Sequence, residues 1–75
     1  MNNTRRKQIA KISVKMDLLQ SELEELQNEE SEYMDNMPES LQETERFETA
    51  EASLEIITEA MESLLEATEK LYEIE

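Results

Sequence analysis

The chain has 75 residues and a formal net charge of −13, from 20 acidic and 7 basic side chains. It contains no cysteine and no histidine, which excludes disulfide bonds, thiolate zinc sites and histidine-based acid–base catalysis. Its apolar residues never occur in runs longer than a pair, which argues against a membrane span or a signal peptide. We expect one small domain in the cytoplasm.

The charge is unevenly distributed along the chain. Residues 1–16 contain five bases and no acid, whereas residues 17–75 contain all 20 acids and two bases. The first segment therefore carries +5 and the second −18. Strongly acidic chains can be disordered. Here the regular spacing of the apolar residues favours a folded, helical structure.

The first half of the chain has the apolar spacing of a coiled-coil helix. Steps of three and four residues alternate, as at the a and d positions of a heptad, and only Glu30 interrupts them. The apolar members are Ile9, Ile12, Met16, Leu19, Leu23, Leu26, Tyr33 and Met37. Thr4 is the candidate N-cap, because its hydroxyl can accept from the first free backbone N–H groups. This pattern predicts a helix over about residues 4–36.

Pro38, the single proline, predicts a turn near the middle of the chain. It lacks an N–H group, and it disfavours the helical conformation at the residue before it. The segment from Ser40 to Glu43 fits a capping box, and Thr44 is a second candidate cap. We place the turn at about residues 37–44. The second helix then begins either at Glu39 or, after a short helical turn, at Glu45.

A second a/d pattern predicts a helix over about residues 45–74. Its members are Phe47, Ala50, Leu54, Ile57, Met61, Leu64 and Leu71, with Thr68 as the one polar member. Aligned antiparallel about residue 40, the two patterns form eight a–d layers, from Ile9 with Leu71 to Tyr33 with Phe47. The predicted fold is all-α, an antiparallel two-helix coiled-coil hairpin about 45 Å long.

Apolar residues outside these two patterns suggest self-association. Together with the a and d positions they give each helix a wide apolar face, which suits a bundle better than a two-stranded coil. We therefore predict a homodimer that forms a four-helix bundle. The candidate interface residues are Val14, Leu18, Ile56, Leu65 and Tyr72. The alternative is a monomer with scattered exposed apolar side chains, which is common in proteins.

The chain shows no catalytic, cofactor or metal motif, so we do not expect an enzyme. Paired carboxylates need a concave site and shifted pKa values to act as acid and base, and a two-helix rod offers no obvious cleft. No segment has the spacing of an EF-hand calcium loop. The basic start could contact phosphate, but the acidic remainder repels nucleic acid. Acidic polar faces also disfavour membrane binding.

The glutamates of the second helix are the candidate partner-binding residues. They are Glu48, Glu51, Glu55, Glu59, Glu62 and Glu66. A strongly negative rod attracts basic protein surfaces, including nucleic-acid-binding grooves. The alternative is that the acids only keep a small bundle in solution.

The segment from Tyr33 to Glu48 resembles a group of small acidic helical proteins of bacteriophages and prophages. They share the turn D-N-M-P-x-x-L-Q-x-[ST]-E-R-[FY]-E, here Asp35 to Glu48, between a Leu/Glu-rich helix and one rich in Glu, Ala, Ile and Leu. Relatives often have glycine in place of Glu43, which favours a second helix that begins near Thr44. The resemblance implies a non-enzymatic protein that binds and inhibits a host or defence protein with a basic surface. Its alternative is a structural or assembly-accessory coiled coil.

Overall fold

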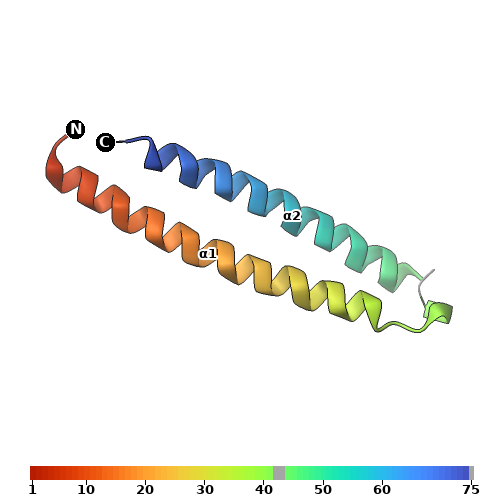
Figure 1. Ribbon diagram of the computed structural model, residues 1–75. Coiled ribbons are helices and arrows are strands. Elements are labelled where there is room, and N and C mark those ends of the chain that lie inside the picture. The colour runs from red at the N-terminus through yellow and green to blue at the C-terminus, as the bar shows by residue number, and fades with distance from the viewer. Residues whose placement is uncertain (42–43, 75) are drawn as a thin grey trace.

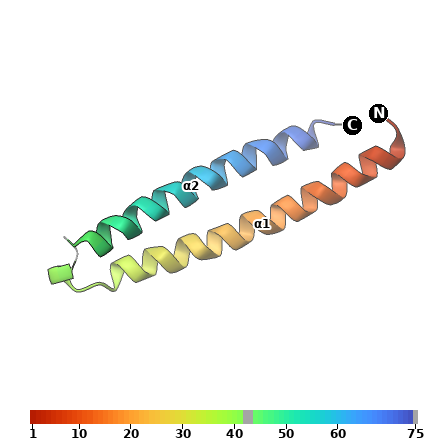
Figure 2. The same ribbon diagram turned by 180° about the vertical axis from the view of Figure 1, so that it is seen from behind.

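The computed structural model describes residues 1–41 and 44–74, and this part of the chain is an all-α hairpin without strands. Helix α1 (Asn3–Asp35) and helix α2 (Glu45–Tyr72) flank a short 3-10 helix, η1 (Glu39–Leu41). The two long helices lie side by side and antiparallel, with both termini at one end and the turn at the other (Figures 1 and 2).

The hairpin is a thin rod. Its Cα atoms extend over 59 × 15 × 12 Å, with a radius of gyration of 17.4 Å. A compact domain of this length would have a radius of gyration of about 11 Å. Few side chains can be fully buried in such a shape. In the described part of the chain the buried residues are Ser13, Met37, Ala50 and Thr68.

Helix α1 is capped by Asn2, so the prediction of Thr4 as the cap was wrong. Asn2 has an extended backbone, with φ −79° and ψ 166°, and its side-chain oxygen accepts from the Arg5 N–H at 2.8 Å. Thr4 already lies within the first helical turn. The reason is that the chain becomes helical two residues earlier than a cap at Thr4 requires, and Asn caps helices as well as Thr does.

The turn ends α1 shortly before Pro38. The Asn36 N–H still bonds the Glu32 carbonyl at 3.0 Å, and the Met37 N–H bonds the Met34 carbonyl at 3.2 Å. The Met37 side chain is buried. No described residue has a positive φ. The chain, which lacks glycine, therefore reverses through conformations that every L-residue adopts readily.

Of the two predicted starts of the second helix, the structure has the one at Glu45, after the short helical turn η1. Thr44 occupies the N-cap position with an extended backbone. Its hydroxyl donates to the Leu41 carbonyl instead of capping α2. The predicted capping box from Ser40 to Glu43 includes two residues, Gln42 and Glu43, that lie outside the described part of the chain.

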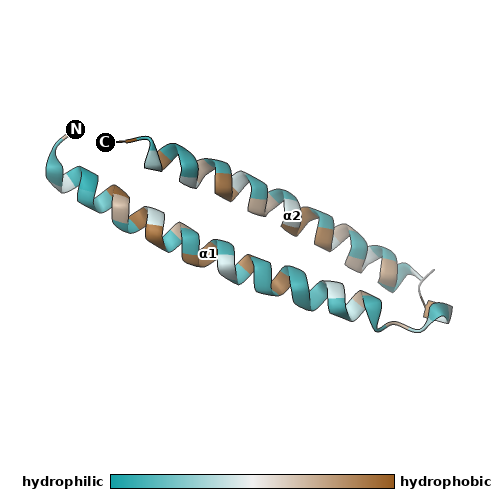
Figure 3. Cartoon of the chain, viewed as in Figure 1, coloured by the Kyte–Doolittle hydropathy of each residue, from teal (hydrophilic) through white to brown (hydrophobic). Residues whose placement is uncertain are grey.

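Helix α2 turns the predicted a/d row toward α1, which confirms this part of the prediction. Ala50 and Thr68 are buried, and the other members are half-buried: Phe47, Leu54, Ile57, Met61, Leu64 and Leu71. Apolar segments recur along both helices between hydrophilic ones (Figure 3). The spacing of α2 was thus sufficient to identify the side that packs.

Helix α1 packs through a different row from the one predicted. Its a positions Ile9, Met16 and Leu23 are half-buried as expected. The second inward row consists of the residues that follow the predicted d positions: Ser13, Gln20, Gln27 and Met34. The predicted d residues are instead about half-exposed: Ile12 48%, Leu19 50%, Leu26 51% and Tyr33 45%. The four predicted layers that contain these residues are therefore not closed as a buried seam, whereas the other four, from Ile9 with Leu71 to Glu30 with Ala50, keep covered members on both helices.

Hydrogen bonds satisfy two polar residues of the inward row, Ser13 and Gln27, whereas the buried Gln20 Oε1 has no hydrogen-bond partner within the described residues. The Ser13 hydroxyl donates to the Ile9 carbonyl at 3.0 Å, within its own helix. The Gln27 Nε2 donates across the interface to the Thr58 hydroxyl at 2.9 Å. In the predicted alignment Gln27 would have faced Ser53 instead. Polar groups that are bonded in this way can be covered at little cost.

Candidate protein-interaction surfaces

The six predicted partner-binding glutamates form one line on α2, which we call the acidic stripe. They are Glu48, Glu51, Glu55, Glu59, Glu62 and Glu66, and all six are exposed. Their spacing of three or four residues places them along one side of a helix. Helix α2 has no basic residue between Arg46 and Lys70, so no cation within the helix interrupts the stripe.

The acidic stripe lies on the side of the hairpin where Thr58 bonds Gln27. Glu51, Glu55 and Glu59 line a shallow surface groove together with Leu54 and Thr58. The groove is lined by α2 alone, and its carboxylates remain open to solvent beside Thr58. Such a surface can attract a basic partner, but it encloses no substrate-sized cavity.

The half-exposed residues of α1 form a second surface, which we call the apolar ridge: Ile12, Leu19, Leu26 and Tyr33. They follow one another at intervals of seven residues, nearly two helical turns, and so lie along one side of α1. Sequence reasoning had assigned them to the core. No periodicity in the sequence distinguishes them, because the row that packs instead, Ser13, Gln20 and Gln27, is polar.

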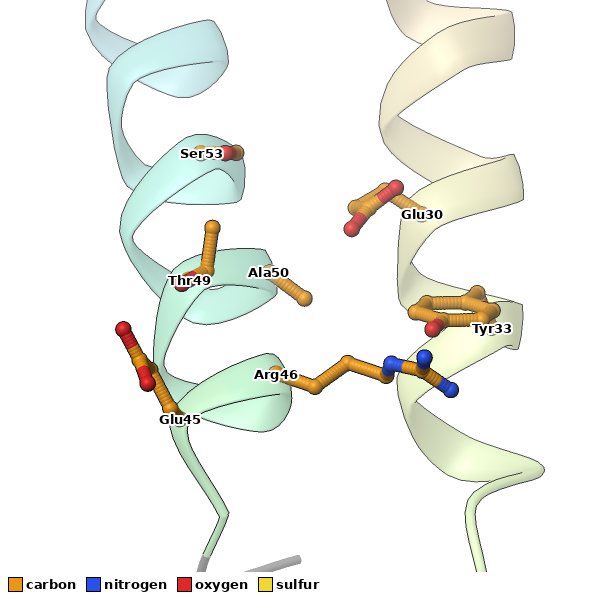
Figure 4. Close-up of a pocket in the computed structure, with 7 residues that line it drawn as sticks. All are labelled: Glu30, Tyr33, Glu45, Arg46, Thr49, Ala50 and Ser53. Atoms are coloured by element: carbon orange, nitrogen blue, oxygen red, sulfur yellow. The ribbon is translucent and has the colours of Figure 1, made fainter.

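Near the turn, the ridge borders an open groove between the helices (Figure 4). Glu30 and Tyr33 of α1 line it with residues of α2 that include Arg46, Ala50 and Ser53. The Arg46 side chain extends from α2 toward Tyr33, and Glu45 points away from the groove.

A row of small residues continues from this groove along α2. Ser53, Ala60 and Ala67 follow Arg46 at intervals of seven residues, and all three are exposed. Because Arg46 and Ser53 share the groove with Tyr33, this small row and the apolar ridge lie on the same face of the hairpin. The Gln27–Thr58 bond and the acidic stripe lie on the other side of the seam.

The structure does not gather the predicted dimer interface on one face. Val14, Leu18, Ile56, Leu65 and Tyr72 are all exposed. Leu65 and Tyr72 are seven residues apart and follow Thr58 at the same interval, so they lie on its side of α2. Val14 lies across α1 from the ridge residue Leu19, five positions away. These five residues remain a prediction as an interface, and Val14 lies on a different side of α1 from the ridge.

Tyr72 forms the second hydrogen bond between the helices. Its hydroxyl donates to the Asp17 carboxylate at 2.6 Å. This bond raises the pKa of Tyr72 above its usual value of 10.0, with smaller contributions from desolvation and from the negative charge of Asp17. The contact ties the end of α2 to the first half of α1.

Within the described residues, no three acidic side chains are arranged to hold a metal ion. Within the same residues, neither helix has an apolar stretch long enough to cross a bilayer. No family model matches the chain, and no curated protein or solved structure matches it. The acidic stripe and the apolar ridge are the candidate functional surfaces.

Proposed function

We propose that the chain is a small acidic, non-enzymatic interaction module that binds and inhibits a host or defence protein with a basic surface. The observation that supports this is the acidic stripe, six exposed glutamates in one line without an intervening base. Fields of this kind steer basic partners and are strengthened at low salt. The turn from Asp35 to Glu48, with its resemblance to phage and prophage proteins, supports a phage origin and action in the bacterial cytoplasm.

We also propose that the chain acts as a homodimer that forms a four-helix bundle. The apolar ridge supports this, because four large side chains in one line remain about half-exposed in the single hairpin. Contiguous apolar surface of this kind marks protein-interaction sites in many proteins. The second inward row of α1, by contrast, is largely polar: it consists of Ser13, Gln20, Gln27 and Met34.

The ridge equally favours a second candidate function, a structural or assembly-accessory coiled coil that acts through self-association. A pull-down from bacterial lysate with tagged protein separates the two. Capture of a nuclease or defence complex that is released by salt supports inhibition. Capture of only the protein itself or of virion components favours the accessory role.

Charge reversal tests whether the acidic stripe is the binding surface. The variant Glu55→Lys/Glu59→Lys should weaken salt-sensitive capture by about tenfold or more, because two central contacts become repulsive. The matched control Glu24→Lys/Glu25→Lys changes the net charge equally on α1 and should retain most of the binding. Equal binding by both variants and the unmodified chain would contradict the electrostatic mechanism.

A further inference from the structure

We infer that the second copy docks on the apolar ridge in the antiparallel orientation, so that the two α1 helices lie against each other. This rests on the homodimer proposed above and specifies its face and orientation. The acidic stripes then remain on the outside of the assembly. A four-helix bundle results, in which α1 packs on α1 and α2 lies beside α2.

The ridge is complementary to itself. A two-fold axis between Leu19 and Leu26 places Leu19 of one copy against Leu26 of the other, and Ile12 against Tyr33. In such an isologous interface each contact occurs twice. The small row beside the ridge, with Ala60 and Ala67, leaves space for the large side chains of the second copy, as in ridge-into-groove packing.

Charge selects the antiparallel orientation. The same axis places residues 5–15, with five bases and no acid, beside residues 30–40 of the other copy, an acidic segment without bases. The acids there are Glu30, Glu32, Asp35 and Glu39. A parallel arrangement would place the five bases beside five bases. Exposed charges contribute little affinity, but juxtaposed like charges disfavour the wrong orientation strongly.

A stable dimer needs most of one broad side of the rod. The rod measures 59 Å by 15 Å. A stable interface covers roughly 800 Å² on each partner, which is close to the projected area of one side of such a rod. Docking on the ridge also covers the apolar row that the single hairpin leaves open, whereas the inward row of α1 is already covered by α2, as at the bond from Gln27 to Thr58.

Disulfide trapping tests the orientation, since the chain has no cysteine of its own. Glu22→Cys, next to the two-fold axis, should form an intermolecular disulfide by itself, in at least tenfold higher yield than the outer control Glu66→Cys. Lys15→Cys and Glu29→Cys should each give little disulfide alone and should cross-link when mixed. Efficient self-linking of either one would overturn the antiparallel orientation.

Light scattering at micromolar concentration tests the face. The unmodified chain should have twice the chain mass of 8.8 kDa. Leu19→Glu/Leu26→Glu should have the mass of one chain while circular dichroism still shows a helical fold, and the control Val14→Glu should stay dimeric. A dimer that survives the double substitution and is lost in Val14→Glu would overturn the ridge as the interface. An unmodified chain that is monomeric throughout would overturn the proposed homodimer itself.

Discussion

Tyr72 and Asp17 join the end of α2 to α1 through a side-chain hydrogen bond. The hydroxyl donates to the carboxylate at 2.6 Å, and the bond holds the phenolic proton in place. The pKa of Tyr72 is therefore raised, first by this bond and then by desolvation and the charge of Asp17. Because the pKa is higher in the folded state, the contribution to stability is present below pH 10 and is lost as the pH rises through the shifted value.

Titration of Tyr72 checks this contact. In a Tyr33→Phe background, absorbance reports Tyr72 alone, and Asp17→Ala should lower its pKa toward 10.0. The control Asp35→Ala, near the turn, should leave the titration of Tyr72 unchanged. The side chain is exposed, so the readout is the titration itself rather than the melting temperature. Identical curves for both variants would show that the two helix ends are not joined as described.

At the scale of the element, the sequence predicted both helices and the turn, because Pro38 and the two apolar patterns act over many residues. It also placed the acidic stripe, since spacing alone puts those glutamates on one side of a helix. It did not place the apolar ridge. Periodicity alone does not decide whether Ile12, Leu19 and Leu26 or the residues that follow them face α2. Side-chain hydrogen bonds such as Gln27 to Thr58, which accompany the observed packing, are not visible in the periodicity.

The cap of α1 gives a prediction at the same scale. Asn2→Ala should destabilise the hairpin by about 1 kcal/mol, because the Arg5 N–H loses its acceptor. In a domain of this size such a loss lowers the melting temperature by roughly 4–8 °C. Thr4→Ala, at the cap expected from the sequence, should change it little. Thermal unfolding followed by circular dichroism measures both, and a larger effect at Thr4 would contradict the observed cap.

At the scale of the whole molecule, the length of the rod determines how closely it can resemble a nucleic acid. One copy carries −13 over 59 Å, a net charge every ~4.5 Å, against about 1.7 Å in duplex DNA. Two copies side by side carry twice the charge over the same length, one every ~2.3 Å by the same measure. A side-by-side dimer therefore approaches the charge density that a nucleic-acid-binding groove recognises, and a single hairpin does not.

Small-angle X-ray scattering distinguishes this dimer from an end-to-end one. Antiparallel docking on the ridge adds width and no length, and helix axes pack 8–10 Å apart, so the radius of gyration should rise by only about 1 Å above that of one hairpin. The monomeric reference is Leu19→Glu/Leu26→Glu, expected near 17.4 Å. An end-to-end dimer of the same mass would nearly double that radius. Such a result would leave the charge density at the value of a single rod, and the proposed inhibition would then have to depend on the stripe of one copy alone.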